Sequence, residues 1–277
     1  MTATLDRRDA LTKVLPMAYA ASEAILAVYA TGTVEVEYKG KDDPVTIADK
    51  NANAILCAAL ERAFPGLPIV AEESDPGTFA GWAGAPAVWF VDPLDGTREF
   101  IARNGEFAVM IGLAEHGRAT LGVIVCPALE RSFVGALGVG AFEVAKDGTE
   151  TPIHVSGVAT LAEAEAVVSR SYGEHALDWL ARRAGLRKVT PCGSAGVKGI
   201  RIATGEADIY SQPGRAGKRW DSCAPEAIVV AAGGAATDER GNAFEYASGE
   251  LSNDHGFIAT NGKLHGAVID LIRQASP

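Results

Sequence analysis

The sequence predicts a layered α/β fold, more closely α+β, in which helices and two β-sheets form an αβαβα sandwich. Strand patterns follow one another between residues 88 and 144, whereas short strands alternate with helices after residue 160. The 277 residues, of which 48% are hydrophobic, also suffice for two coupled subdomains. We therefore predict an N-terminal α+β subdomain over residues 1–160 and a C-terminal α/β subdomain over residues 161–277.

The N-terminal region contains two helix patterns and two strand patterns. Apolar side chains recur at helical spacing over residues 4–30, which predicts a long amphipathic helix. Residues 33–38 (TVEVEY) alternate with period two and predict a strand. A polar loop then leads to a predicted helix over residues 48–64, which the Pro-Gly pair at 65–66 ends, and to a short strand at 67–71 (LPIVA).

The remaining elements divide into a run of strands and an alternating region. A buried strand is predicted at residues 88–91 (VWFV), where a proline follows and is expected to end the ladder and turn the chain. Residues 107–144 (FAVMIGL, ATLGVIVCP, RSFVGAL, GAFEVA) predict an antiparallel meander. Farther along, strand patterns (EAVVSRS, RKVTPCG, ADIYS, GFIATN) alternate with helix patterns (HALDWLARRAG, VKGIRIATG, DSCAPEAIVVAAGG, HGAVIDLIRQ), which predicts a second sheet covered by helices.

Charge and composition narrow the classes of partner. The net charge is −10 and the basic residues are scattered, so no nucleic acid polymer is expected to bind. A small anionic substrate requires an intervening cation. No unbroken apolar run reaches the roughly 20 residues of a membrane span, and the N-terminus lacks a signal-peptide core, so no stable membrane insertion is expected. Four cysteines without CxxC spacing predict free buried thiols and a cytoplasmic location.

The stretch DPLDGT at residues 92–97 carries the most specific chemistry. Asp92 and Asp95 flank Pro93 at the end of the buried strand, so their carboxylates are expected to lie close together. At about 4 Å two such charges repel by roughly 4 kcal/mol at an effective dielectric near 20. The repulsion is offset either by a proton on one acid or by a cation between them, and a hard divalent cation suits a larger acidic cluster better.

Gly96 and Thr97 follow at the predicted first turn of a helix. Free N–H groups at a helix start bind phosphate oxygens, and the Thr97 hydroxyl can hold a water. No competing motif occurs: HExxH, GxSxG and a P-loop ending in GK[ST] are all absent. Each of the other acidic residues, taken alone, is explained by a structural role, and Asp221 alone also fits a helix N-cap. The stretch therefore predicts metal-assisted phosphate chemistry, in which two metal ions can clamp the attacking and leaving oxygens.

Three motifs in order resemble one enzyme superfamily. Glu72-Glu73, DPLDGT and WDSCAPE (220–226) are similar to the signature of the lithium-sensitive, magnesium-dependent phosphatases related to inositol monophosphatase. The resemblance extends over nearly the whole chain and implies the inositol monophosphatase-like sandwich. The flank TREFIARNGEF (97–107) resembles the 3'(2'),5'-bisphosphate nucleotidases within that superfamily.

The resemblance implies a set of functional residues. Two or three Mg²⁺ ions are expected on side chains of the N-terminal subdomain and one from the C-terminal subdomain, and Asp49 with Thr97 is expected to position or deprotonate the attacking water. Glu73 is expected to play a supporting role. The implied metal ligands are Glu72, Asp92, Asp95 and Asp221 through their side chains and Leu94 through its carbonyl, with Glu72 also counted among the catalytic residues.

The resemblance also implies substrate contacts and a substrate. The expected substrate is adenosine 3',5'-bisphosphate, which loses its 3'-phosphate to give AMP. Tyr172 departs from the histidine common in relatives, which puts the base or ribose contact in question. The implied substrate-binding residues are Gly96, Thr97, Ser171, Gly193, Ser194, Lys198 and Asp221, and the candidates for the second phosphate are Arg170, Arg215, Lys218 and Arg219.

Two other functions remain compatible with the sequence. An inositol monophosphatase, a histidinol-phosphate phosphatase or a fructose bisphosphatase on the same scaffold would share every metal ligand. A non-catalytic nucleotide or cation sensor would not need Asp49 and Thr97, which are both present. A homodimer is also compatible, because relatives are commonly dimers.

Overall fold

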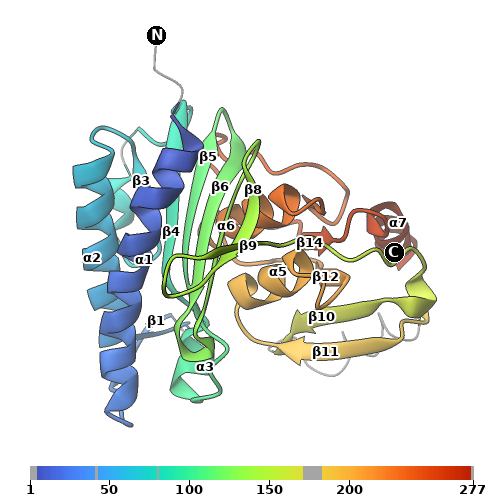
Figure 1. Ribbon diagram of the computed structural model, residues 1–277, viewed down its shortest axis with the longest axis horizontal. Coiled ribbons are helices and arrows are strands. Elements are labelled where there is room, and N and C mark those ends of the chain that lie inside the picture. The colour runs from blue at the N-terminus through green and yellow to red at the C-terminus, as the bar shows by residue number, and fades with distance from the viewer. Residues whose placement is uncertain (1–4, 41–42, 80, 171–182, 276–277) are drawn as a thin grey trace.

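The computed structural model describes residues 5–40, 43–79, 81–170 and 183–275. A seven-stranded sheet occupies the centre of the molecule (Figure 1). Its strands run in the order β3-β4-β5-β6-β7-β8-β9, and all neighbours are antiparallel except β3 and β4. The predicted meander is therefore confirmed. The strands are β3 (Ile69–Ala71), β4 (Ala87–Asp95), β5 (Ala108–Glu115), β6 (Arg118–Cys126), β7 (Arg131–Ala136), β8 (Gly140–Val144) and β9 (Glu150–Pro152).

A second sheet is built from the later part of the chain and has five strands in the order β11-β10-β12-β14-β13. β10 pairs in parallel with β11 and β12, whereas β14 is antiparallel to β12 and β13. A small β1–β2 hairpin lies apart from both sheets. The strands are β1 (Val36–Gly40), β2 (Asp43–Thr46), β10 (Glu165–Ser169), β11 (Lys188–Cys192), β12 (Ile209–Gln212), β13 (Ala235–Thr237) and β14 (Phe257–Thr260).

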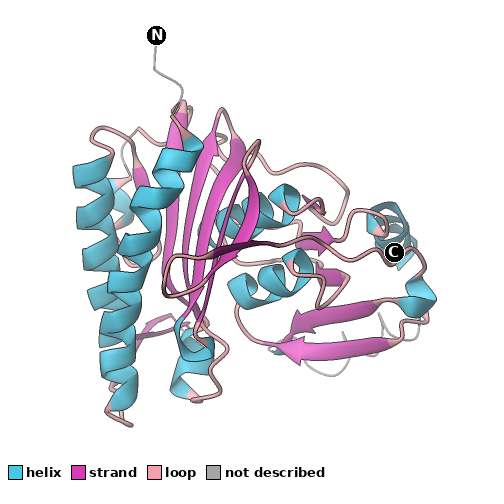
Figure 2. Ribbon diagram, in the orientation of Figure 1, coloured by secondary structure: helices cyan, strands magenta, loops and turns pink. Residues whose placement is uncertain are grey.

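Helices complete five layers. α1 and α2 cover one face of the large sheet, α5 and α6 lie between the two sheets, and α7 lies beyond the second sheet (Figure 2). This is the αβαβα sandwich that the sequence predicts. The helices are α1 (Arg7–Ala30), α2 (Ile47–Ala63), α3 (Thr97–Ile101), α5 (Ala195–Ala203), α6 (Arg219–Ala231) and α7 (His265–Ala275), with 3₁₀ turns η1 (Pro76–Thr78), η2 (Pro127–Leu129) and η3 (Leu161–Glu163).

The long N-terminal helix α1 forms part of the core. Asp6 caps its start by accepting hydrogen bonds from the backbone N–H groups of Arg8 and Asp9. The apolar face packs on α2 and the large sheet through buried residues such as Val14 and Ile25. Among the described residues, α1 alone is long and apolar enough to cross a membrane, with a mean hydropathy of 1.3. A core helix passes the same test.

A row of glycines lets α6 approach the large sheet closely. Gly112, Gly122 and Gly135 are direct neighbours across β5, β6 and β7. A Cβ at Gly112 would lie 2.7 Å from the Ala224 nitrogen, and one at Gly122 would overlap the Ala224 carbonyl. Because no side chain separates the helix from the sheet here, α6 lies directly on the strands, and its N-terminus reaches the end of β4.

Three sequence predictions need correction. The predicted polar loop before α2 contains strand β2, which pairs with β1. β4 does not end at Pro93: it continues to Asp95 through a bulge, because a bulge is one of the few places where a sheet tolerates proline. β9 and β13 have no counterpart among the predicted elements, because each is only three residues long. Most of the helix predicted at 175–185 lies outside the described residues.

Candidate active site

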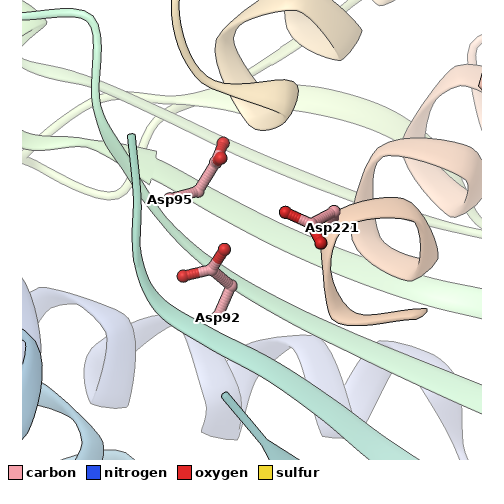
Figure 3. Close-up of side chains that lie close together, drawn as sticks. All are labelled: Asp92, Asp95 and Asp221. Carbon is pink, nitrogen blue, oxygen red and sulfur yellow. The ribbon is translucent and has the colours of Figure 1, made fainter. Parts of the chain in front are cut away.

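Three carboxylates converge where β4 meets α6. Asp92 and Asp95 come from the end of β4, and Asp221 comes from the first turn of α6. Each offers a carboxylate oxygen, and these oxygens all lie within 4.8 Å of one another (Figure 3). Residues far apart in the sequence thus form one cluster, which we call the carboxylate trio.

The bulge in β4 sets the direction of the two strand carboxylates. Asp92 pairs with Met110 and Asp95 with Ala108, so two residues of β4 stand opposite one residue of β5. The extra residue brings Asp92 and Asp95 onto the same side, although a spacing of three would place them on opposite faces of a regular strand. The backbone N–H of Leu94 donates to Asp92 Oδ1 at 3.0 Å and fixes that carboxylate.

Three ionised carboxylates in the trio would repel one another strongly unless a proton or a cation lay between them. Burial raises the pKa of Asp92 well above its ordinary value, and the nearby charges of Glu72, Asp95 and Asp221 raise it further. Burial also raises the pKa of Asp221 well above its ordinary value, with Glu72 and Asp95 adding to the effect. A divalent cation would offset this repulsion, and three convergent carboxylate oxygens are ligands that hard cations such as Mg²⁺ prefer. The donor set therefore fits a metal ion.

In the absence of a metal ion, we expect Asp92 and Asp221 to make the folded protein less stable as pH rises. The folded-state pKa values of Asp92 and Asp221 lie above the unfolded values, so the folded protein binds their protons more tightly than the unfolded chain does. The contribution of these two groups to the free energy of unfolding is thus fully present below the ordinary aspartate pKa and is lost as pH rises through the raised pKa values. Saturating Mg²⁺ should raise Tm by roughly 5–10 °C at about pH 8 and by less at about pH 5. Calorimetry in EDTA and in Mg²⁺ measures this; equal shifts at both pH values would contradict it.

Glu72 and Glu73 follow β3 beside the trio. Burial raises the pKa of the Glu72 carboxyl, which also interacts with that of Asp92. Lys39 Nζ from β1 lies 2.9 Å from Glu72 Oε1 and 2.6 Å from Glu73 Oε1. Burial alone would lower the pKa of Lys39, but the charges and hydrogen bonds of both glutamates raise it above its ordinary value. Burial raises the pKa of Glu73 to about 7. Glu72 thus lies beside the trio, and both glutamates share Lys39 as an ion-pair partner.

Asp49 and Thr97 form a hydrogen-bonded pair in which Asp49 is buried and Thr97 is half-buried. Asp49 lies in the first turn of α2, where its Oδ2 accepts from the Thr46 backbone N–H at 2.8 Å and the Thr46 hydroxyl at 2.6 Å. Its Oδ1 accepts from Thr97 Oγ1 at 2.9 Å. Burial raises the pKa of Asp49. Since Thr97 also lies 3.3 Å from the Leu94 carbonyl, the pair is anchored beside the metal-binding stretch.

A turn from the second half of the chain meets Asp95. The Ser194 hydroxyl and the Gly196 N–H both donate to Asp95 Oδ2, the latter at 2.8 Å. Lys198, one turn into α5, is buried, and its ammonium lies 3.4 Å from the Cys192 carbonyl and over the Tyr210 ring. Burial lowers the pKa of Lys198, although the charges of nearby acids partly counter this.

Two cavities meet at the trio. The larger, of about 1030 Å³, is lined by residues that include Lys39, Glu72, Arg215 and Lys218. The smaller, of about 160 Å³, is lined by Asp95, Ser194, Lys198 and others. Asp221 lines both cavities, so a substrate bound at the trio can extend into either.

The other residues predicted to contact substrate lie in different surroundings. Gly96 caps the short helix α3 in the left-handed conformation, directly before Thr97. Arg170 pairs with Glu106, and Gly193 donates its N–H to the same Glu106. Arg219 lies apart from both cavities at the trio and lines a separate pocket, where it bonds the Glu250 carbonyl and the Asn253 side chain. Ser171 and Tyr172 lie outside the described residues.

Sequence reasoning missed three features of the site. Lys39, which joins both glutamates, sits in a strand with no motif of its own. Glu106 has no signal in the sequence beyond its place in the flank TREFIARNGEF. The glycine row on which α6 packs is visible in the sequence, since each of three consecutive predicted strands contains a central glycine.

Comparisons with known proteins agree with this geometry. The family model described as "Inositol monophosphatase family" matches residues 8–276. The 3'(2'),5'-bisphosphate nucleotidase CysQ of Salmonella typhimurium is 35% identical over 90% of this chain and 99% of its own, and the Escherichia coli K12 protein of the same name is 34% identical over 89% and 98%.

Solved structures of inositol monophosphatases share the fold of this chain. The inositol monophosphatase from Anabaena superposes with a TM-score of 0.80 at 26% identity, covering 99% of this chain and 98% of that one. The IMPase from Thermotoga maritima gives a TM-score of 0.81 at 27% identity, covering 96% and 97%. The chain belongs to the inositol monophosphatase family.

Proposed function

We propose that this protein is a magnesium-dependent phosphatase that converts adenosine 3',5'-bisphosphate to AMP and phosphate. The carboxylate trio is the observation that carries the reaction class, because it concentrates metal ligands at the junction of two cavities. The similarity to the two CysQ proteins along about nine-tenths of the chain supports the nucleotide substrate.

Two or three Mg²⁺ ions would bind in this proposal, and the described side chains support positions for two of them. The trio would hold one ion, and Glu72 with Asp92 would hold another, with the Leu94 carbonyl as a further oxygen ligand. When bound, such ions supply positive charge to the phosphate oxygens and make a coordinated water more acidic. The donor atoms are all oxygens, as a hard cation requires.

Asp49 and Thr97 orient the attacking water in this proposal. Because Thr97 donates its own hydroxyl proton to Asp49 Oδ1, its oxygen is left to accept a hydrogen bond from water. The raised pKa of Asp49 makes it a better proton acceptor than an exposed aspartate, provided that it is ionised. The pair can therefore accept a proton from the water through the Thr97 hydroxyl while holding the water in line with phosphorus.

The two cavities suggest how the nucleotide lies. The scissile 3'-phosphate belongs at the trio, which borders both cavities. Lys198 is a buried ammonium in the smaller cavity, where an anionic or polar part of the nucleotide would gain most from it. Arg215 and Lys218 line the larger cavity and are the basic residues placed to meet a second phosphate there.

A substrate panel tests the proposal. We expect Mg²⁺-dependent phosphate release with kcat/KM for adenosine 3',5'-bisphosphate at least about a hundredfold above that for inositol 1-phosphate, because a nucleotide gives the second phosphate and the base additional contacts. Histidinol phosphate and fructose 1,6-bisphosphate complete the panel. A preference for inositol 1-phosphate or a sugar phosphate would overturn the substrate assignment, and no release from any compound would favour a sensor.

We also propose a cytoplasmic location. Cys57, Cys126, Cys192 and Cys223 all lie in the described residues and are all free thiols. Unpaired cysteines are typical of proteins that work in a reducing compartment.

A further inference from the structure

Glu106 links three segments at the edge of the active site. It lies just before β5, and its Oε2 accepts hydrogen bonds from the Gly193 N–H at 2.7 Å and from Arg170 Nη2 at 2.5 Å. Its own backbone N–H is held by Asn104 Oδ1 at 3.0 Å. One carboxylate of the first half of the chain thus holds both the end of β10 and the turn before α5.

That turn is the segment that contacts a predicted metal ligand. Ser194 has a φ of 58°, a left-handed conformation that is unfavourable for a residue with a side chain, so surrounding contacts must maintain it. In this conformation the Ser194 hydroxyl and the Gly196 N–H both reach Asp95 Oδ2. Two donors on the same oxygen fix the orientation of the Asp95 carboxylate.

Close packing transmits the position of Glu106 to the metal-binding stretch. A Cβ at Gly96 would lie 2.9 Å from the Glu106 carbonyl oxygen and 3.4 Å from Ser194 Cβ, so the three residues leave no free space between them. A Cβ at Gly193 would overlap the Glu99 side chain. A shift of Glu106 would therefore move the turn relative to Asp95.

We propose that Glu106 is a positioning residue that seats the Gly193–Gly196 turn so that Ser194 and Gly196 orient Asp95 for metal binding. The inference rests on the proposed function in one respect, since it requires a divalent cation at Asp95. Glu106 touches neither the trio nor the attacking water in this scheme. It acts through the Gly193 N–H, and its bond to Arg170 is separate.

The test measures binding of Mn²⁺ alone, without substrate, to the full-length chain by calorimetry and electron paramagnetic resonance. Glu106→Ala is expected to raise the Mn²⁺ Kd about tenfold, the loss typical of removing a group that orients a metal ligand. Glu143→Ala is the matched control: Glu143 is similarly exposed, at 34% against 25% for Glu106, and also binds an arginine, but it lies on β8. Its Kd should equal that of the wild type.

Three further variants test whether Glu106 acts on Asp95 through the Gly193–Gly196 turn. Arg170→Ala leaves the Gly193 bond in place and should keep the wild-type Kd, whereas an equal loss in Arg170→Ala and Glu106→Ala would overturn the proposed route. Because Glu106 acts through the turn that carries Ser194, the losses in Glu106→Ala and Ser194→Ala should be less than additive in the double variant. Fully additive losses would contradict the inference.

The outcomes separate this inference from the proposed function. Wild-type protein that fails to bind Mn²⁺ would overturn the proposed function itself. Wild-type protein that binds Mn²⁺ with the same Kd as Glu106→Ala would overturn only the role of Glu106. Should the alanine variant not fold, Glu106→Met keeps the length of the side chain but offers the Gly193 N–H no acceptor; its Kd should rise about tenfold, and an unchanged Kd would count against the inference.

Discussion

Replacing Asp92 by asparagine is expected to lower kcat/KM for adenosine 3',5'-bisphosphate by at least about a thousandfold, because the loss of charge stabilisation by metal costs several kcal/mol. Asp92 links both groups of ligands: it belongs to the trio, and its carboxyl interacts with that of Glu72. An asparagine at this position keeps the shape but offers a metal ion no negative charge. Phosphate release over a range of Mg²⁺ concentrations measures the effect.

The same variant should remain folded. Asp92 is buried among acids that repel it, so its replacement removes an unfavourable charge and should leave Tm in EDTA unchanged or higher. Asp9→Asn, on the exposed face of α1, is the control and should retain full activity. A folded Asp92→Asn protein with normal turnover at saturating Mg²⁺ would sink the metal-centred mechanism.

Loss of the Asp49 carboxylate should have the next largest effect on catalysis. Asp49→Asn is expected to lower kcat by about 10²–10⁴-fold, the usual contribution of a positioned proton acceptor. The Mg²⁺ concentration for half-maximal activity should change little, because both Asp49 oxygens are bound by Thr46 and Thr97 rather than directed to the trio. Since activity requires ionised Asp49, wild-type kcat should fall as pH drops through the raised pKa of this group.

Variants of Thr97 separate the proton path from the helix cap. Thr97→Ser keeps the hydroxyl and should stay active, whereas Thr97→Val keeps the size and should lose activity to about the same extent as Asp49→Asn. The valine variant leaves the Thr46–Asp49 cap intact, so its activity loss cannot come from an unfolded α2. Equal activity of the serine and valine variants would contradict the assigned role of the hydroxyl.

The sequence predicts the fold best where a pattern is local and long. The meander can be predicted from the sequence because each strand has several residues of alternating or apolar character and a tight turn after it. β2, β9 and β13 are too short to carry such a pattern, and their pairing depends on partners elsewhere in the chain. In the sequence, a bulge at Pro93 cannot be distinguished from a strand end, because proline removes one ladder hydrogen bond in either case.

The candidate site divides in the same way. The spacing of Asp92 and Asp95 predicts a cluster directly, whereas only the resemblance to a family links Asp221 to them. In the structure Asp221 reaches them because α6 packs on the glycine row. Glu106 has its effect through hydrogen bonds to residues 64 and 87 positions away. Arg219 illustrates the opposite case: it directly precedes the WDSCAPE motif that contains Asp221, but its side chain lines another pocket.

The most direct measurement is identification of the products formed from adenosine 3',5'-bisphosphate with Mg²⁺ and with EDTA. We expect equimolar phosphate and 5'-AMP in Mg²⁺, with the 5'-phosphate retained, and no reaction in EDTA, because the carboxylate trio requires a cation to accept a phosphate. Formation of adenosine 3'-phosphate, undiminished release in EDTA, or an unchanged substrate in Mg²⁺ would contradict the account.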